Sequence, residues 1–177
     1  MSFDSAKAFL RENGAETIEH PGGTLYAHLC RVADRLAELG AGRDLQLAGL
    51  THATYGTDGF PRPLLDPSAR DRLRAVIGAP AEDLVYLYGA CDRDKTWPVL
   101  AETATVHDRF TGQAVRLDGA RLMPFVDLCV VNELDVIEHN PALLAEHGAY
   151  FHDLFDRWAL VTSPDVADEA QRVLTGI

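Results

Sequence analysis

Residues 24–53 read TLYAHLCRVADRLAELGAGRDLQLAGLTHA, and this stretch predicts two consecutive helices separated by a glycine break. Apolar side chains recur along its first half at the spacing of one helix face, and Thr24 stands where an N-cap is expected. Gly40 and Gly42 end the first helix, and Asp44 opens the second.

Each of these two helices carries one histidine on its apolar side. His28 lies between Leu25 and Val32, its i−3 and i+4 neighbours, and so shares the core-facing stripe. His52 shares a face with Leu45 and is followed by a turn-rich segment, residues 55–61, which cannot continue the helix. We therefore expect His52 at a helix C-terminus, beside an irregular loop where a site could open to solvent.

The rest of the chain has helical periodicity almost throughout, so the predicted fold class is all-α. Weak alternation around Thr111-Gly112 adds one small β-hairpin near 105–117, and 15–23 is expected to be a loop. The other predicted helices cover 2–13, 67–77, 81–93, a segment from Pro124 to about 139, 142–159 and 164–175. A chain of 177 residues suits a single domain spanning 1–177.

Bulk composition narrows the classes of partner. The formal net charge of −11 would repel nucleic-acid backbones and anionic membranes, so neither is expected as a partner. The three cysteines are odd in number and form no CxxC pair, which indicates reduced core residues in a cytoplasmic protein. We expect no signal peptide and no transmembrane helix. A small-molecule substrate remains compatible with this charge, and a homodimer is left open.

Asp127 is the third candidate ligand, after His28 and His52. It has apolar residues at helical spacing on both sides and is expected to face inward. A buried carboxylate needs a partner, and one metal ion shared with two imidazoles is the simplest. The alternative partner is a helix cap or an arginine such as Arg93 or Arg121. We therefore predict one divalent ion, Mn, Fe or Zn, held by His28, His52 and Asp127.

His20 is a candidate fourth ligand. In a continuous helix it would stand about 12 Å from His28 along the axis, too far to share an ion. The Pro21-Gly22-Gly23 break allows the chain to fold back, so sharing stays open, as does the alternative of an exposed loop histidine.

Three further residues are candidates for the chemistry itself. Tyr55 and Asp58 follow His52 in the loop and are the nearest candidates for proton transfer. The alternative is that their side chains only stabilise the turn. Arg93 could clamp an anion bidentately or merely cap a helix. Asn132 and Glu133 lie about 140° and 120° from Asp127 around the helix, so we expect them on the solvent side or in a supporting role.

Three stretches resemble the motifs of the HD-domain (His-Asp) metal-dependent phosphohydrolases. Residues 25–33, LYAHLCRVA, resemble the first motif, and 47–53, LAGLTHA, resemble the His-Asp motif that follows it. Residues 127–129, DLC, resemble the last motif, an isolated aspartate on a late helix. Within the superfamily the guanosine tetraphosphate hydrolase branch is the most similar. The resemblance covers about residues 20–139 and implies an HD-like helical bundle.

The chain departs from this family at the aspartate of the His-Asp motif. Ala53 stands where the family has aspartate, and alanine cannot donate an electron pair. The remaining donors suit a single ion with an open position rather than a metal pair. The guanosine tetraphosphate hydrolases also carry two acidic residues shortly afterwards, where this chain has Gly56 and Thr57, with Asp58 one step later.

The resemblance implies a metal-dependent hydrolase that acts on a small phosphorylated or nucleotide-like substrate, with one ion activating water. Two alternatives stay open. The chain could be an HD-fold iron-dependent oxygenase or another non-hydrolytic enzyme of small-molecule metabolism. It could also be a catalytically retired HD-like domain that only binds a ligand, because Ala53 removes a carboxylate from the site.

Overall fold

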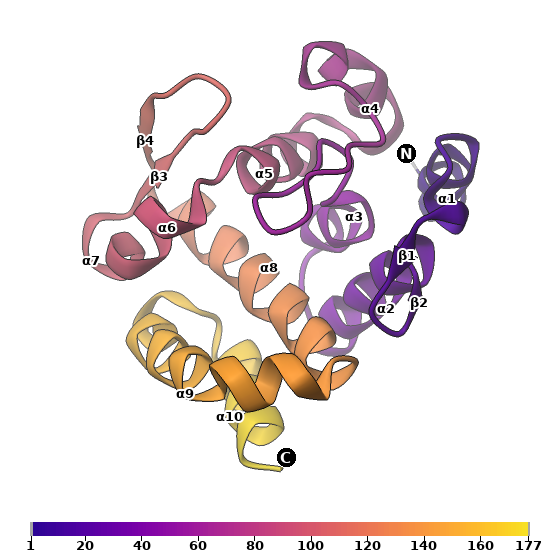
Figure 1. The fold of residues 1–177 in the computed structure, drawn as a ribbon. Coiled ribbons are helices and arrows are strands. Elements are labelled where there is room, and N and C mark those ends of the chain that lie inside the picture. Colours follow the sequence, from indigo (N-terminus) through magenta and orange to yellow (C-terminus); the bar gives the residue numbers. More distant parts are fainter. Residues whose placement is uncertain (1, 177) are drawn as a thin grey trace.

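The computed structural model describes residues 2–176 and confirms the all-α prediction (Figure 1). The α-helices are α1 (Phe3–Glu12), α2 (Leu25–Glu38), α3 (Arg43–Thr51), α4 (Arg70–Ile77), α5 (Ala79–Ala90), α6 (Arg93–Thr96), α7 (Leu100–Thr103), α8 (Gly119–Glu138), α9 (Pro141–Trp158) and α10 (Pro164–Thr175). Strand β1 (Glu19–His20) pairs antiparallel with β2 (Gly23–Thr24), and β3 (Thr105–His107) pairs antiparallel with β4 (Ala114–Arg116). The predicted hairpin near 105–117 is therefore present.

Local capping explains where several helices begin. The Thr24 hydroxyl accepts a hydrogen bond from the backbone N–H of Ala27 at 3.2 Å, which caps α2 as predicted. The predicted start of α8 at Pro124 is wrong. Asp118 caps α8 by accepting the Arg121 N–H at 3.0 Å, so this helix begins at Gly119. Pro124 then stands inside the helix, where its missing N–H removes one intrahelical hydrogen bond.

Helix α8 forms the centre of the molecule, and it contacts α2, α3, α5, α9 and α10 (Figure 1). Every residue from Phe125 to Asp135 is buried. A helix that is covered on all sides has no solvent face, so its polar residues must find partners inside the protein. Each face of α8 therefore points toward a different neighbouring helix.

The segment 15–23 that was expected to be a loop contains a short 3-10 helix (Ala15–Thr17) and most of the β1–β2 hairpin. Its turn uses Gly22 at φ +77° and Gly23 at φ +127°, backbone conformations that favour glycine. Arg31 on α2 donates to the carbonyls of Pro21 and Gly22, both at 3.2 Å. These bonds hold the hairpin against α2 and place His20 beside His28.

Helices α2 and α3 approach each other closely at Gly49. A Cβ at this position would collide with the side chain of Leu36 on α2. The close packing brings the C-terminal end of α3, capped by His52, to the first turn of α2, where His28 lies. No helix in the described residues is long and apolar enough to cross a membrane.

Candidate functional site

A pocket of about 360 Å³ lies among the β1–β2 hairpin, α2, the loop after α3, α8 and α9. Its polar lining includes His20, His28, His52, Asn132 and Glu133. The apolar lining residues are Pro21, Leu25, Ala53, Phe60, Trp97, Val136, Leu143 and Phe151. The structure therefore brings three of the four predicted ligands, the histidines, to one cavity.

His28 is held in one orientation by its Nδ1 atom. That nitrogen lies 2.6 Å from Oδ2 of Asp135, and a carboxylate oxygen can only accept, so Nδ1 carries the proton. Arg31 donates to both oxygens of Asp135, at 2.7 and 2.8 Å. Burial alone would raise the pKa of Asp135, but these hydrogen bonds from His28 and Arg31 hold that pKa well below its ordinary range. Asp135 is therefore a fixed anion behind the imidazole.

His52 is oriented in the same way by a backbone carbonyl. Its Nδ1 donates to the Gly49 carbonyl at 2.8 Å, which leaves Nε2 with a lone pair. Burial, reinforced by the neighbouring His28 ring, lowers the pKa of His52 to about 3. The ring is therefore neutral near pH 7, and its lone pair points into the cluster.

Three acceptor atoms meet at the centre of this pocket. Nε2 of His28 lies 3.3 Å from Nε2 of His52 and 3.0 Å from Oδ1 of Asn132. The amide of Asn132 is oriented by Glu133, whose Oε1 accepts its Nδ2–H at 2.8 Å. Lone pairs that face one another at these distances repel, so the arrangement needs a positive charge between them, either a proton or a metal ion.

His20 covers the same cluster from the hairpin. Its ring stacks on His28 with centroids 4.1 Å apart and an interplanar angle of 26°. Its Nδ1 is buried and makes no hydrogen bond with any described residue. Burial, and next the neighbouring His28, lowers the pKa of His20 to about 4, so the ring is neutral near pH 7 and one of its two nitrogens is free of a proton.

Arg93 lines the pocket, but its charge already has a partner. Its Nη1 lies 2.9 Å from Oε1 of Glu133, and its Nη2 donates to the Tyr88 hydroxyl at 2.9 Å. The guanidinium also lies over the Trp97 ring, 4.5 Å from its centroid. Arg93 is thus a buried ion pair at the pocket wall rather than an unengaged anion clamp.

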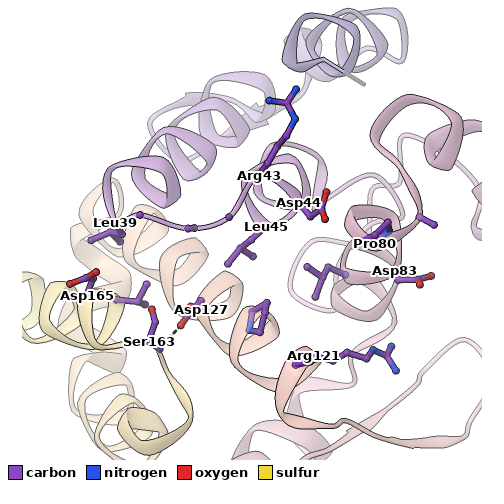
Figure 2. A pocket seen from close by; sticks show the side chains of 18 residues that line it. Leu39, Arg43, Asp44, Leu45, Pro80, Asp83, Arg121, Asp127, Ser163 and Asp165 are labelled. Carbon is purple, nitrogen blue, oxygen red and sulfur yellow. Dashed lines mark hydrogen bonds between the residues drawn. The ribbon is translucent and has the colours of Figure 1, made fainter.

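The structure does not bring Asp127 to the histidines, which corrects that expectation. Asp127 lines a different cavity, and its Oδ1 accepts the backbone N–H of Ser163 at 2.9 Å, just before α10 (Figure 2). The predicted 140° between Asp127 and Asn132 separates the two faces of α8 as expected. The face that meets the histidines is the one with Asn132, not the one with Asp127. The sequence could not distinguish them, because this part of α8 is buried on every side.

Tyr55 and Asp58 also lie away from the pocket lining. Tyr55 is buried and donates its hydroxyl proton to Oε1 of Glu82 at 2.8 Å. Asp58 is exposed, and its Oδ2 accepts the backbone N–H of Arg93 at 2.9 Å, which fixes the start of α6. Both residues support the local structure, and neither touches the three histidines.

Sequence reasoning missed Asp135, and it gave Asn132 and Glu133 only a place on the solvent side or a supporting role. Glu133 has the supporting role, because it orients the Asn132 amide, whereas Asn132 itself contacts His28. One signal was present in the pattern: α8 carries Asn132, Glu133 and Asp135 within four positions of an otherwise apolar run. Charged residues so deep in an apolar helix need partners, and His28, Arg31 and Arg93 supply them.

Within residues 2–176, no group of three or more His, Cys, Asp or Glu side chains is arranged to hold a metal ion. The donors that converge here are two imidazoles and an amide oxygen, with His20 beside them. Imidazole nitrogen and amide oxygen are both known metal ligands, and metal-binding histidines commonly donate their second ring N–H to a carboxylate or a carbonyl. Both His28 and His52 have that second bond.

Comparison with known proteins is limited to one family. Residues 9–93 match the model of a family described as a domain of unknown function (DUF6817). That segment carries the three histidines and Arg93 but ends before α8, which supplies Asn132 and Asp135. Neither a curated protein nor a solved structure matches the chain.

Proposed function

We propose that the chain is a metal-dependent hydrolase of a small anionic substrate, with one divalent ion held by Nε2 of His28, Nε2 of His52 and Oδ1 of Asn132. The main support for this proposal is that the lone pairs of these three atoms converge on one point. Both imidazoles are held in place by hydrogen bonds from Nδ1, to Asp135 and to the Gly49 carbonyl. Metal–nitrogen bonds of about 2.0–2.1 Å at tetrahedral or octahedral angles place two ligand nitrogens roughly 2.9–3.4 Å apart. The observed 3.3 Å between the two Nε2 atoms fits that range.

Charge supports an anionic substrate. The two acidic groups at the pocket are already neutralised, Asp135 by Arg31 and Glu133 by Arg93. A divalent ion bound only by neutral imidazoles and an amide would keep its full charge, and that charge favours a phosphate or carboxylate group. The cavity of about 360 Å³ is near the lower end of the range for small-molecule sites, which favours a small substrate.

The chain's own residues supply the remaining functions. When bound, the ion would lower the pKa of a water molecule and polarise a substrate oxygen. His20 is the group placed to take a proton in the pocket, because its ring is neutral near pH 7, lines the cavity and stacks on His28. The aromatic rings of Phe60, Trp97 and Phe151 line the pocket and exclude water from it.

A non-catalytic ligand-binding domain is the second candidate, and one observation favours it. Ala53 lines the pocket with a methyl group, so the metal site has no carboxylate ligand. In that case a proton on Nε2 of His28, shared with Asn132 and His52, supplies the positive charge that the cluster needs.

Metal analysis separates these functions. The protein is prepared with added Mn²⁺, Zn²⁺ or, without oxygen, Fe²⁺, and bound metal is measured together with phosphate release from a panel of phosphate monoesters. We expect about one ion per chain, its loss in His52→Ala, and its retention in His147→Ala, a half-exposed histidine on α9. If the folded wild-type protein takes up no metal, the hydrolase proposal is wrong and the non-catalytic ligand-binding domain is favoured. Iron loading with dioxygen uptake would instead identify an oxygenase.

A further inference from the structure

A second and larger cavity, about 750 Å³, lies on another face of α8 and contains Asp127 (Figure 2). Its lining comes from the α2–α3 connection and from the N-terminal halves of α3, α5, α8 and α10. We call it the Asp127 cleft. Its volume lies within the range of small-molecule sites. None of the three histidines lines it, so this cleft is separate from the proposed metal site.

Asp127 is a buried carboxylate without a cationic partner. Its residue is only 5% exposed, and among residues 2–176 it forms no ion pair. Ser163 satisfies one oxygen through its backbone N–H at 2.9 Å. Burial raises the pKa of Asp127, an effect that the hydrogen bonds from Ser163 reduce only in part. A cation next to this carboxylate would remove much of the cost of burying its charge.

The basic residues of the cleft do not supply that cation. Arg43 points toward α1 and lies over the Phe3 ring, 5.1 Å from its centroid. Arg121 is exposed and extends away from Asp127 in Figure 2. At the rim, Asp44 and Asp165 add two exposed carboxylates in the first turns of α3 and α10. These carboxylates offset the positive ends of their helices, so an anion would meet negative charge on entry.

The walls of the cleft are mainly apolar. Leu45 and Val166 are core residues whose surfaces face the cavity, and Leu84 is partly exposed there. Pro80 and Pro124 add rigid apolar surface. A ligand that fills this space would therefore bury an apolar body against the walls and place one polar group at Asp127.

We propose that the Asp127 cleft binds a small organic cation, an ammonium group carried on an apolar body. The ammonium lies at the carboxylate of Asp127, and the apolar body packs against Leu45, Leu84 and Val166. The chemistry is charge complementarity between a buried, unpaired carboxylate and a cation, with apolar contact supplying the remaining affinity.

The test compares two probes of nearly equal shape, 2-naphthylmethylamine, which is an ammonium at pH 7, and the neutral 2-naphthylmethanol. Binding to the full chain is followed by two-dimensional amide NMR, with the Ser163 amide as the reporter next to Asp127. We expect the amine to bind about tenfold more tightly than the alcohol, as one charge-assisted hydrogen bond would give. The largest shifts are expected at Ser163 and Gly42.

Three variants make the result specific. Asp127→Asn keeps an oxygen for the Ser163 N–H and removes the charge, so the preference for the amine should disappear. Asp71→Asn removes a carboxylate that is 98% exposed on α4 and should keep the preference. Leu84→Arg places a cation at the wall of the cleft, so it should weaken binding of the amine more than binding of the alcohol. Equal binding of the two probes, shifts outside the cleft, no binding, or a preference that survives in Asp127→Asn would each overturn the proposal.

Discussion

Replacing Asp135 by asparagine tests how the proposed metal site is organised. In the wild type, Asp135 accepts from Nδ1 of His28 at 2.6 Å and from Arg31 at 2.7 and 2.8 Å. The asparagine has only one oxygen, and Arg31 cannot accept a hydrogen bond, so the oxygen turns to Arg31 and the NH₂ group to His28. The His28 proton then moves to Nε2, where it occupies the lone pair needed for a metal.

Two magnitudes follow from these contacts. A hydrogen bond to a charged group contributes about 1.5–3 kcal/mol. The asparagine retains one acceptor, and the Arg31 side chain is 29% exposed, so water replaces part of the loss. We expect unfolding free energy to fall by about 2–3 kcal/mol. Metal affinity should fall by about 10- to 100-fold, the usual effect of losing the group that orients a metal-binding histidine.

The assay combines urea denaturation, metal titration by calorimetry, and long-range ¹⁵N NMR of the imidazole rings, which reports the tautomer. Arg31→Met is the matched control, because it removes the cation but leaves the bond between Asp135 and His28. It should lower stability while keeping the Nδ1–H tautomer and most of the metal affinity. The reasoning is refuted if Asp135→Asn keeps that tautomer and binds metal within twofold of the wild type.

Three further predictions concern other parts of the chain. Ala53→Asp returns a carboxylate to the pocket and should raise metal affinity at least about tenfold by calorimetry; unchanged affinity would count against the ligand assignment. Burial alone raises the pKa of Glu82, but hydrogen bonds from Arg70 and Tyr55 bring it below its ordinary value. The resulting stability is present above the unfolded pKa of about 4.3 and is lost as pH falls through the folded pKa. Urea denaturation between pH 3 and 7 should show this loss in the wild type and much less of it in Glu82→Gln, and parallel pH profiles would contradict it. Gly89→Ala places a Cβ 3.0 Å from the carbonyl oxygen of Gly56, so unfolding free energy should fall by about 1–2 kcal/mol, and a variant as stable as the wild type would contradict this contact.

Features with a local cause could be predicted from the sequence. Thr24 caps α2, and Asn140-Pro141 separates α8 from α9, because capping and proline geometry depend only on nearby residues. The 3.6-residue pattern also placed His28 and His52 on inward faces of two neighbouring helices, and the short link between α2 and α3 makes their meeting predictable.

Features without periodicity or without a solvent face could not be predicted. Strands β1 and β2 have two residues each, too few for an alternating pattern, so the hairpin that carries His20 was not foreseen. On α8 the buried stretch includes Asp127, Asn132 and Asp135 alike. Apolar periodicity distinguishes a buried face of a helix from a solvent-exposed one. Along this stretch α8 has no solvent-exposed face, so the pattern cannot show which residue faces which neighbour.

The sequence by itself determined the helical class, most helix boundaries and the inward placement of His28 and His52, because these follow from caps, breaks and apolar spacing within single segments. Only the tertiary structure decided which acidic and amide groups of α8 join those histidines. Asn132 and Asp135 meet them because α2 packs on that face of α8, whereas Asp127 faces the start of α10. The packing of helices far apart in the chain made this choice, which no local pattern encodes.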